Sequence, residues 1–538
     1  MSAVEHASPS IDEPLPSDDR TSATRGERRF EALLVVVYLA VVSFVSARHE
    51  PWADETQTWR LAIDTHGLAD LYRSSRDEGH PLLFHVLLQM LGHLSRSWWA
   101  PVVLHVAIAG TAAWLVARYA PFTRLQKLLL VFGYFPLYEY GVIVRPYGLG
   151  MMLTFAACAT WTLARRRILW TGVLLALLAN TTVMGTLIAL TLLLAFVIDW
   201  AWPDGEAPFQ TLRRHPAGLL VVGVVALAVF GLAALQFTRP ALVPDVTVQS
   251  TFSLWRIGSI PLVELRAMMP IAIASDGVAE WFHWAFLPES SLALAGLVLV
   301  SAIVLAVGCL IAARRRASLV FFVVGTTGFI VFFDFLLEGQ ARHHGSLFLV
   351  WVAAAWLAWS GSPSAWPLLP RLGDSAIAMG RRLFTCSLVL PLLGALEFVV
   401  ADVRAPFADT RRAVAAIRRE GLATAPIIAL DRLHAQSVGA LLDRPVTFPV
   451  ERKTRTFVEW GRGSRGRGPA ATDSTATALL ARECRVIVFA LAEEQLLPST
   501  SARGRLMYIT PDAPMDGYRF HIWLLTAPPS PRCPSTHR

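Results

Sequence analysis

The sequence predicts an all-α polytopic membrane protein of about eleven transmembrane helices, followed by a C-terminal extracytoplasmic α/β domain. Two observations support this prediction. The 538 residues are 54% hydrophobic and only 16% charged, whereas an ordinary soluble domain has about 25% charged residues. The charges are also uneven, with 45 among the 371 residues of 30–400 and 33 among the 138 residues of 401–538. A membrane body with a soluble tail excludes a cytosolic enzyme, a secreted disulfide scaffold and a disordered protein.

The first segment, residues 1–29, is rich in Ser, Pro, Asp and Glu and ends in Arg25, Arg28 and Arg29. We expect a disordered cytoplasmic leader, because the segment is too long and acidic for a signal peptide and no small-residue cleavage site follows. Eleven apolar runs then approach the roughly 20 residues that a spanning helix needs. They lie at 31–47, 100–117, 128–143, 147–164, 168–181, 183–200, 217–236, 291–312, 318–336, 346–360 and 383–400.

Basic residues at the ends of these runs predict the orientation of the helices. They fall on alternate connections, at Arg118, Arg124, Lys127, Arg165 to Arg167, Arg213, Arg214, Arg314 to Arg316, Arg381 and Arg382. The positive-inside rule makes these connections and the N-terminus cytoplasmic. We therefore expect a multi-pass protein of the inner (cytoplasmic) membrane. Because the number of spans is odd, its tail is expected on the extracytoplasmic side.

The same orientation predicts outer loops at 48–99, 237–290 and 337–345. Within the first of these, the apolar run 82–94 is too short to span a bilayer, and it contains His85 and His93. We therefore expect it to be a juxtamembrane helix of the outer loop.

The tail, 401–538, alternates helical and extended patterns. Asp409 is expected to cap an amphipathic helix that ends near Glu420, and a Gly/Arg-rich loop from Gly461 to Gly468 separates two halves. Further elements are expected at 426–431, 435–442, 485–490 and 518–526, which together predict a small α/β domain. Cys484 and Cys533 can pair if the tail faces an oxidising compartment.

The net charge of +8 comes mostly from the tail, which holds 20 basic and 13 acidic residues. Basic motifs flanked by aromatic residues are missing, so no nucleic-acid partner is expected. The expected surroundings are membrane lipid.

Acidic residues gather at the start of the first outer loop. The chain reads His49-Glu50-Pro51-Trp52-Ala53-Asp54-Glu55 directly after the first span and continues to Arg76-Asp77-Glu78-Gly79-His80-Pro81. Carboxylates at a lipid boundary are well placed to have shifted pKa values and to meet a lipid-borne substrate. The competing interpretation of Asp54 is a carboxylate that only stabilises the start of a helix.

This pattern resembles the GT-C superfamily of integral-membrane glycosyltransferases, the group of the aminoarabinose transferases and protein O-mannosyltransferases. The resemblance rests on the Asp-Glu pair after the first span, the Glu-Gly-His-Pro motif and the later turn Tyr138-Glu139-Tyr140 with Arg145-Pro146-Tyr147. It covers residues 31–167 best. It implies a GT-C-like membrane body over 30–400, a polyprenyl-phosphate-sugar donor and a glycan, lipid or protein acceptor.

The resemblance also implies roles for single residues. Asp54 matches the carboxylate that acts as general base or orients the acceptor, and Glu55 beside it would bind a metal or position a helix. His80 would close the rim of the active site, and Glu78, Glu139 and Tyr147 are expected to bind the substrate with it. No cofactor is certain; a divalent metal is possible, and its ligands stay unassigned because no His/Cys cluster of recognised spacing is present.

A second polar cluster follows the ninth span and contains Arg342, His343 and His344. Arg grips phosphate oxygens in a bidentate manner, so Arg342 is the first candidate for the donor phosphate, with the two His residues as further hydrogen-bond donors. Arg145 is the second candidate, and Glu139 is expected to pair with it. The alternative is a solvated interfacial loop with no binding role.

The resemblance therefore implies a glycosyltransferase, expected to be inverting, that moves a hexosyl or pentosyl group at the outer face of the membrane. The rival is a transporter or flippase of lipid-linked saccharides, which predicts charges in the middle of spans. The transferase predicts that Asp54, Arg145 and Arg342 line one cavity that opens to the outside. The transporter predicts a polar path across the bilayer instead.

Overall fold

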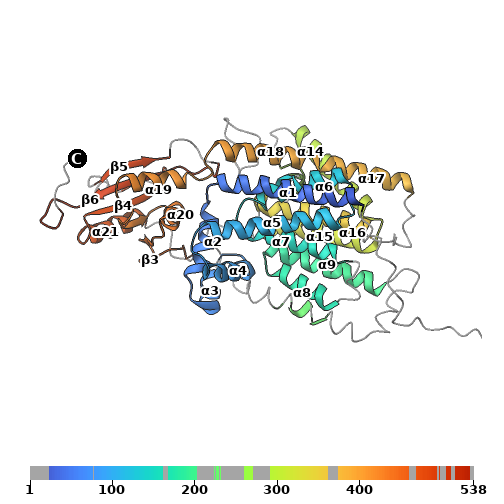
Figure 1. Ribbon diagram of the computed structural model, residues 1–538, viewed down its shortest axis with the longest axis horizontal. Helices are drawn as coiled ribbons and strands as arrows, with labels where there is room; N and C mark the ends of the chain where they lie inside the picture. Colours follow the sequence, from blue (N-terminus) through green and yellow to red (C-terminus); the bar gives the residue numbers. More distant parts are fainter. Residues whose placement is uncertain are drawn as a thin grey trace, which may run out of the picture.

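The computed structural model describes residues 24–76, 78–161, 168–202, 260–270, 291–337, 339–360, 373–459, 468–492, 504–510 and 515–533, with a few single residues at 223–231 and 496. The chain forms an elongated molecule with a helical body at one end and a sheet-containing tail domain at the other (Figure 1). The expected span 217–236 and the Gly/Arg-rich loop from Gly461 to Arg467 lie largely outside the described residues.

Helices make up the body. In chain order they are α1 (Arg25–Arg48), α5 (Trp99–Tyr119), α6 (Arg124–Val131), α7 (Pro146–Ala159), α8 (Ile168–Ala179), α9 (Val183–Ala201), α13 (Ile260–Met268), α14 (Ser291–Ala312), α15 (Arg316–Phe335), α16 (Ala341–Trp359), α17 (Asp374–Ser387) and α18 (Val389–Arg404). Six apolar helices among the described residues are long enough to cross a membrane, namely Arg25–Arg48, Trp99–Tyr119, Val183–Ala201, Ala295–Ala312, Arg316–Asp334 and Asp374–Arg404. The count of eleven spans stays a prediction.

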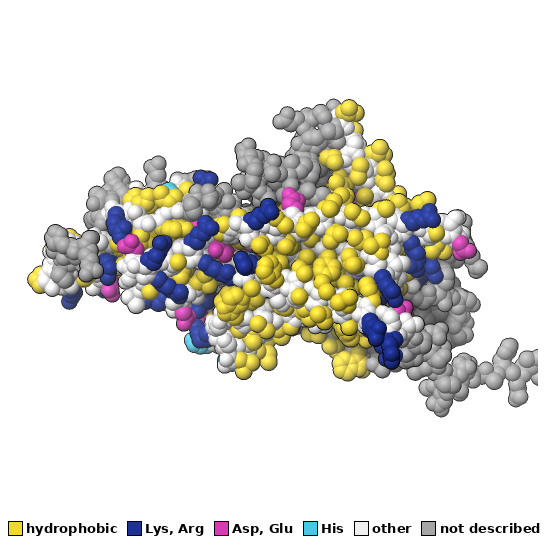
Figure 2. All heavy atoms as spheres, turned by 45° about the horizontal axis from the view of Figure 1, so that its top comes forward, with side chains coloured by type: hydrophobic (Ala, Val, Ile, Leu, Met, Phe, Trp, Pro, Cys, Tyr) yellow, Lys and Arg dark blue, Asp and Glu magenta, His cyan; other side chains and the backbone are white. Residues whose placement is uncertain are grey.

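The body carries an apolar outer surface. α1 exposes Leu33 and Val36, and α14 exposes Leu292 and Leu299. Figure 2 shows hydrophobic side chains as a continuous field over the middle of the molecule, with Lys and Arg gathered on either side of it. Exposed apolar side chains gathered on helices that are long enough to cross a bilayer are typical of a surface that faces lipid.

α16 is the central helix of the body. All residues from His344 to Trp359 are buried, and the small side chains of Ala353 to Ala355 let neighbouring helices approach closely. Trp356 stacks on Phe155 of α7, with their ring centroids 5.8 Å apart. The helix begins earlier than expected, so Arg342, His343 and His344 belong to its first turn and not to a loop. Gln340 and His343 form a capping box that sets this start.

The expected span 128–143 is not one helix. α6 ends at Val131, a π-helical turn η2 (Phe135–Glu139) follows, and the chain then runs without helix to Pro146. Pro136 lacks the N–H that a continuous helix needs. Irregular backbone at membrane depth is tolerated only when protein covers it, and residues 133–150 are buried throughout. The break places Val144 and Arg145 against the loop 48–99, where they bond Glu55 and Asp54.

The loop 48–99, which the sequence predicts to lie outside, forms three short helices between the body and the tail domain (Figure 1). They are α2 (Ala53–Asp64), α3 (Gly67–Ser75) and α4 (Leu83–Gly92). α4 occupies the apolar run 82–94 and is a short helix, as predicted. α2 packs against the tail domain, where the Thr56 hydroxyl lies 3.0 Å from that of Ser437.

The tail domain is a three-layer α/β/α unit around a six-stranded sheet of order β3-β2-β1-β4-β6-β5. Its elements are α19 (Thr410–Arg419), β1 (Ile427–Ala429), α20 (Arg432–Leu442), β2 (Val446–Phe448), β3 (Lys453–Arg455), α21 (Gly468–Leu480), β4 (Arg485–Leu491), β5 (Gly504–Ile509) and β6 (Phe520–Thr526). β1 pairs in parallel with β2 and β4, and the outer pairs are antiparallel.

Side chains alternate across the sheet, as the period of a strand requires. Ile487 and Phe489 pack with α19 and α20 on one face, whereas Val486 and Val488 pack with α21 on the other. Asp409 occupies the predicted cap position of α19, but its side chain accepts no capping hydrogen bond. It accepts instead from the hydroxyl of Tyr508, 2.6 Å away.

Candidate active site

Asp54 lies in the first turn of α2, just after the chain leaves α1. Its Oδ2 is 3.3 Å from Nη2 of Arg145 and 3.5 Å from Nη2 of Arg342. The Asp54 side chain is 23% exposed, while those of Arg145 and Arg342 are 7% and 11% exposed. One reachable carboxylate is therefore held by two largely buried cations, which come from the break before α7 and from the start of α16.

Trp52 supports both guanidinium groups. Their central carbons lie 5.9 Å (Arg145) and 4.8 Å (Arg342) from the centre of the indole. A cation over an aromatic face is attracted by the ring quadrupole, and Trp52 is itself buried against Phe407. The indole thus fixes the two Arg side chains side by side.

Arg145 is further held by α2 and by the loop before α4. Its Nη1 donates to the backbone oxygen of Asp54 at 2.9 Å and to Oγ1 of Thr58 at 3.2 Å. Its Nη2 lies 3.0 Å from Nε2 of His80. Burial and the charge of Arg145 hold the pKa of His80 well below its usual value. Because Arg only donates, a neutral His80 accepts at Nε2 and carries its proton on Nδ1.

The Nδ1 atom of His80 is buried, and among the described residues it has no hydrogen-bond partner. A buried donor without a partner is costly in a folded protein. The ring of Tyr147 lies beside it, with centroids 5.7 Å apart. His80 and Tyr147 therefore form one wall of the Asp54 site.

The start of α16 also contacts this group of side chains. The hydroxyl of Tyr140 donates to the backbone oxygen of Arg342 at 2.6 Å, and His343 meets Tyr147 edge to face at 5.8 Å. Nδ1 of His343 accepts from the backbone N–H of Gln340 at 2.9 Å, so the other ring nitrogen carries the proton. His344 points elsewhere and packs on Phe333 with centroids 4.9 Å apart.

Glu55 turns away from Asp54. One carboxylate oxygen accepts from the backbone N–H of Val144 at 2.6 Å, and the other accepts from that of Trp52 at 2.7 Å and lies 3.0 Å from Nε2 of His49. The Glu55 side chain is completely buried. It ties α2 to the break before α7.

His49 continues this link to α18. Its Nδ1 lies 2.7 Å from Oδ2 of Asp402. Burial works against a charge on His49, but Asp402 and Glu55 outweigh it and raise the pKa to about 10. The resulting cation between two carboxylates was missed by sequence reasoning, because nothing in the local pattern pairs His49 with a residue near the end of the body.

Two further predicted residues lie at the margins of the site. Glu78 accepts from Nε2 of Gln57 at 2.6 Å, and Gln57 in turn bonds the backbone of Val458 in the tail domain. Glu139, expected to pair with Arg145, accepts from the hydroxyl of Tyr134 at 2.7 Å within its own turn. Among the described residues no group of three His, Cys, Asp or Glu side chains is placed to hold a metal ion.

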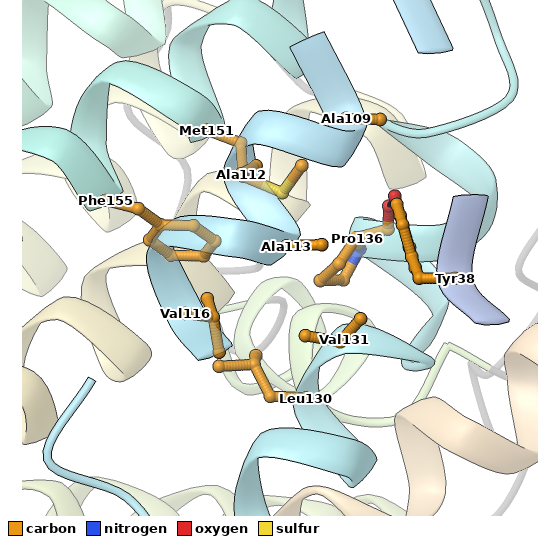
Figure 3. A pocket seen from close by; sticks show the side chains of 10 residues that line it. All are labelled: Tyr38, Ala109, Ala112, Ala113, Val116, Leu130, Val131, Pro136, Met151 and Phe155. Atoms are coloured by element: carbon orange, nitrogen blue, oxygen red, sulfur yellow. Dashed lines mark hydrogen bonds between the residues drawn. The ribbon is translucent and has the colours of Figure 1, made fainter. Parts of the chain in front are cut away.

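An apolar crevice lies apart from this polar cluster, between α1, α5, α7 and the segment from α6 to η2 (Figure 3). It is lined by Tyr38, Ala109, Ala112, Ala113, Val116, Leu130, Val131, Pro136, Met151 and Phe155. The hydroxyl of Tyr38 donates to the backbone oxygen of Pro136 at 2.7 Å, so the lining offers no reactive group.

Comparison with known proteins gives structural neighbours but no sequence relative. No protein-family model and no curated protein sequence matches the chain. The fold is similar to that of ArnT from Cupriavidus metallidurans, in structures bound to undecaprenyl phosphate and in the apo state. Each comparison has a TM-score of 0.48 and 14% sequence identity, and covers 93% of this chain and 99% of that chain.

Proposed function

We propose that the protein is a membrane glycosyltransferase that moves a sugar from a polyprenyl-phosphate donor to an acceptor at the outer face of the inner membrane. The observation that carries the proposal is the convergence of Arg145 and Arg342 on Asp54. A pair of fixed cations suits a phosphate leaving group, and the carboxylate between them suits a base. All three stand where the apolar body meets the tail domain.

The donor phosphate would bind Arg342 and Arg145. Arg342 lies in the first turn of α16, where the positive end of the helix adds to its charge. The polyprenyl chain would remain in lipid, since the cluster adjoins the apolar body. Trp52 keeps both guanidinium groups oriented, which lowers the entropy lost when they grip the phosphate.

Asp54 would act as the base. In the transfer step an acceptor oxygen or nitrogen forms a bond to the anomeric carbon, while the bond from that carbon to the phosphate oxygen breaks. The leaving phosphate keeps the electron pair and is stabilised by the Arg pair, and the acceptor proton passes to Asp54. A single displacement of this kind inverts the anomeric configuration.

In the free protein Asp54 occupies the place that the donor phosphate would take beside the two guanidinium groups. One Nη2 atom of each Arg now faces the same carboxylate oxygen. A phosphate that engages Arg145 and Arg342 draws them from Asp54 and leaves the carboxylate free to accept a proton. Donor binding would thus precede activation of the base.

The remaining predicted residues fall into two groups. His80 with its buried Nδ1–H, Tyr147 and His343 line the site and would contact the donor's sugar or phosphate. Glu55, Glu78 and Glu139 accept hydrogen bonds from neighbouring protein groups and His344 packs on Phe333, and we assign all four positioning roles. Of the two roles that the resemblance implies for Glu55, we propose helix positioning, which its hydrogen bonds to the backbone N–H groups of Trp52 and Val144 support.

The tail domain supports the outer location. Cys484 and Cys533 form a disulfide with an S–S distance of 2.13 Å, and disulfides persist in oxidising compartments outside the cytosol. The rival transporter needs a polar path across the bilayer, whereas Asp54, Arg145 and Arg342 converge at one end of the body. The transferase is therefore the function that we propose.

The test is transfer of radiolabelled sugar by the purified full-length protein. A panel of undecaprenyl-phosphate sugars serves as donors and an envelope extract of the producing cells as acceptor. We expect labelled product from at least one donor, loss of it with Asp54→Asn, and retention with Asp70→Asn, which alters a carboxylate on α3. No product from any donor, together with saccharide movement across reconstituted vesicles, would establish the transporter instead.

A further inference from the structure

A turn of the tail domain, residues 515–518, is seated on the membrane body beside the candidate site. The backbone N–H groups of Met515 and Asp516 donate to the backbone oxygens of Pro406 (3.3 Å) and Phe407 (3.0 Å), in the segment that joins α18 of the body to α19 of the tail domain. Met515 is buried in the same apolar cluster as Trp52 and Phe407. α20 links the turn to the candidate site: its His434 meets Asp516, and its Gln436 and Ser437 lie 3.1 Å and 3.0 Å from the hydroxyl of Thr56, two residues after Asp54 on α2.

A buried ion triad holds this turn in place. Nδ1 of His434 lies 2.7 Å from Oδ2 of Asp431, and its Nε2 lies 3.4 Å from Oδ2 of Asp516. All three side chains are at most 5% exposed. Asp516 also accepts from the backbone N–H of Tyr518 at 3.1 Å. The triad therefore connects α20 to the turn and fixes the backbone on both sides of Gly517.

Tyr518 is the side chain that this turn presents. Gly517 has a φ of +79°, a left-handed conformation that Gly adopts without strain, and it reverses the chain between the buried Asp516 and Tyr518. Tyr518 is 47% exposed, and its ring lies 5.6 Å from that of His434. Its hydroxyl is near enough to the site for Asp54 to raise its pKa and Arg342 to lower it, after burial and Asp516.

We propose that Tyr518 is an acceptor-contacting, specificity-determining residue, and that the acceptor it meets is a hydroxyl-rich, glycan-bearing molecule. The donor lipid reaches Asp54 from the membrane body, so a side chain on the tail domain meets what arrives from water. An aromatic face with a polar tip offers apolar area to the C–H face of a sugar and a hydrogen bond to its hydroxyl groups. This inference rests on the proposed function.

The experiment compares Tyr518→Ala and Tyr518→Phe with Ile509→Ala, which removes a similarly exposed apolar side chain from β5. Transfer from the active undecaprenyl-phosphate sugar is measured against increasing amounts of envelope extract, and the product is fractionated into glycan-containing and protein material. Binding of undecaprenyl phosphate is measured separately. Tyr518→Phe keeps the ring and removes only the hydroxyl group, so it tests the role of Tyr518 even if Tyr518→Ala folds poorly.

We expect Tyr518→Ala to raise the half-saturating amount of extract about ten-fold and Tyr518→Phe to raise it about three-fold, as loss of one hydrogen bond implies. Undecaprenyl phosphate binding and the Ile509→Ala variant stay at wild-type values. An unchanged half-saturating amount in both Tyr518 variants, or label found only in protein, overturns the inference while leaving the transferase intact. Absence of transfer by the wild-type protein overturns both.

Discussion

Nη2 of Arg342 lies 3.5 Å from Oδ2 of Asp54, although one residue opens the central helix of the body and the other opens a helix of the first outer loop. The pair joins the two segments that the sequence singled out separately. Because Asp54 is part-exposed and Arg342 is nearly buried, an anion that enters from solvent or lipid reaches the carboxylate first and must displace it to reach the guanidinium group. This competition leads to the first prediction.

Asp54→Asn should abolish most transfer while strengthening phosphate binding. The amide cannot take a proton, so turnover should fall by about 10² to 10⁴. It also removes the negative charge that faces Arg145 and Arg342, so undecaprenyl phosphate should bind a few-fold more tightly. Single-turnover transfer and lipid binding measure the two effects, with Asp70→Asn as the control. Normal turnover would remove Asp54 as the base, and unfolding would make it a structural cap.

Arg342→Lys should weaken donor binding without unfolding the protein. Lys keeps the charge but loses the planar fork that grips two phosphate oxygens and stacks on Trp52. Loss of one charge-assisted hydrogen bond corresponds to roughly a ten-fold or greater loss of affinity. Undecaprenyl phosphate binding is compared with that of Arg404→Lys at the exposed end of α18. Wild-type affinity in both Arg342→Lys and Arg342→Ala would place the phosphate elsewhere.

Much of the fold follows from local pattern, because apolar runs and alternating strands depend on neighbouring residues. α1, α5, α9, α14 and α15 match their predicted runs closely. The failures have physical causes. The run 128–143 is apolar throughout, yet it breaks at η2 because the surrounding protein covers its backbone. The strands β1, β2 and β3 are only three residues each; β1 is buried throughout and lies in an apolar run, whereas β3 is polar and largely exposed, so its sequence gives no strand pattern.

The site was predicted in its parts but not in its contacts. Asp54, Arg145 and Arg342 could be predicted because they are charged residues next to apolar runs in the sequence. His49 and Asp402 do not, because their link depends on how α1 and α18 pack. The sequence pattern predicts Tyr518 only as the start of an extended segment. Its position near the site could not be predicted, because it depends on how the tail domain packs against the body.

Glu55→Gln should cost stability more than chemistry. The carboxylate is buried against His49 and two backbone N–H groups, and breaking such a pair leaves a buried charge at a cost of about 3 to 5 kcal/mol. Thermal unfolding should occur at lower temperature, while transfer per folded molecule at low temperature stays within a few-fold of wild type. A large loss of transfer with unchanged unfolding would instead make Glu55 a catalytic or metal-binding residue.

Stability should depend on pH through His434. Burial opposes its charge, but Asp431 and Asp516 outweigh burial and raise its pKa from 6.5 to about 10. A raised pKa in the folded state contributes stability that is fully present below the unfolded value and is lost as pH rises through the folded value. Thermal unfolding measured between these two pH values should therefore show declining stability in wild type and a flatter profile in His434→Gln. Parallel profiles would contradict this account.

The last prediction concerns the side of the membrane on which the tail domain lies. The Arg clusters predict a cytoplasmic N-terminus, and the disulfide between Cys484 and Cys533 requires an oxidising compartment. A periplasm-active reporter fused after residue 530 should therefore be active, and a reporter active only in the cytoplasm should be silent. The double variant Cys484→Ser with Cys533→Ser should lose about 2 to 4 kcal/mol of stability without changing reporter activity. Activity of the cytoplasmic reporter would reverse the assigned orientation, and with it the delivery of an acceptor from the outer face to Asp54.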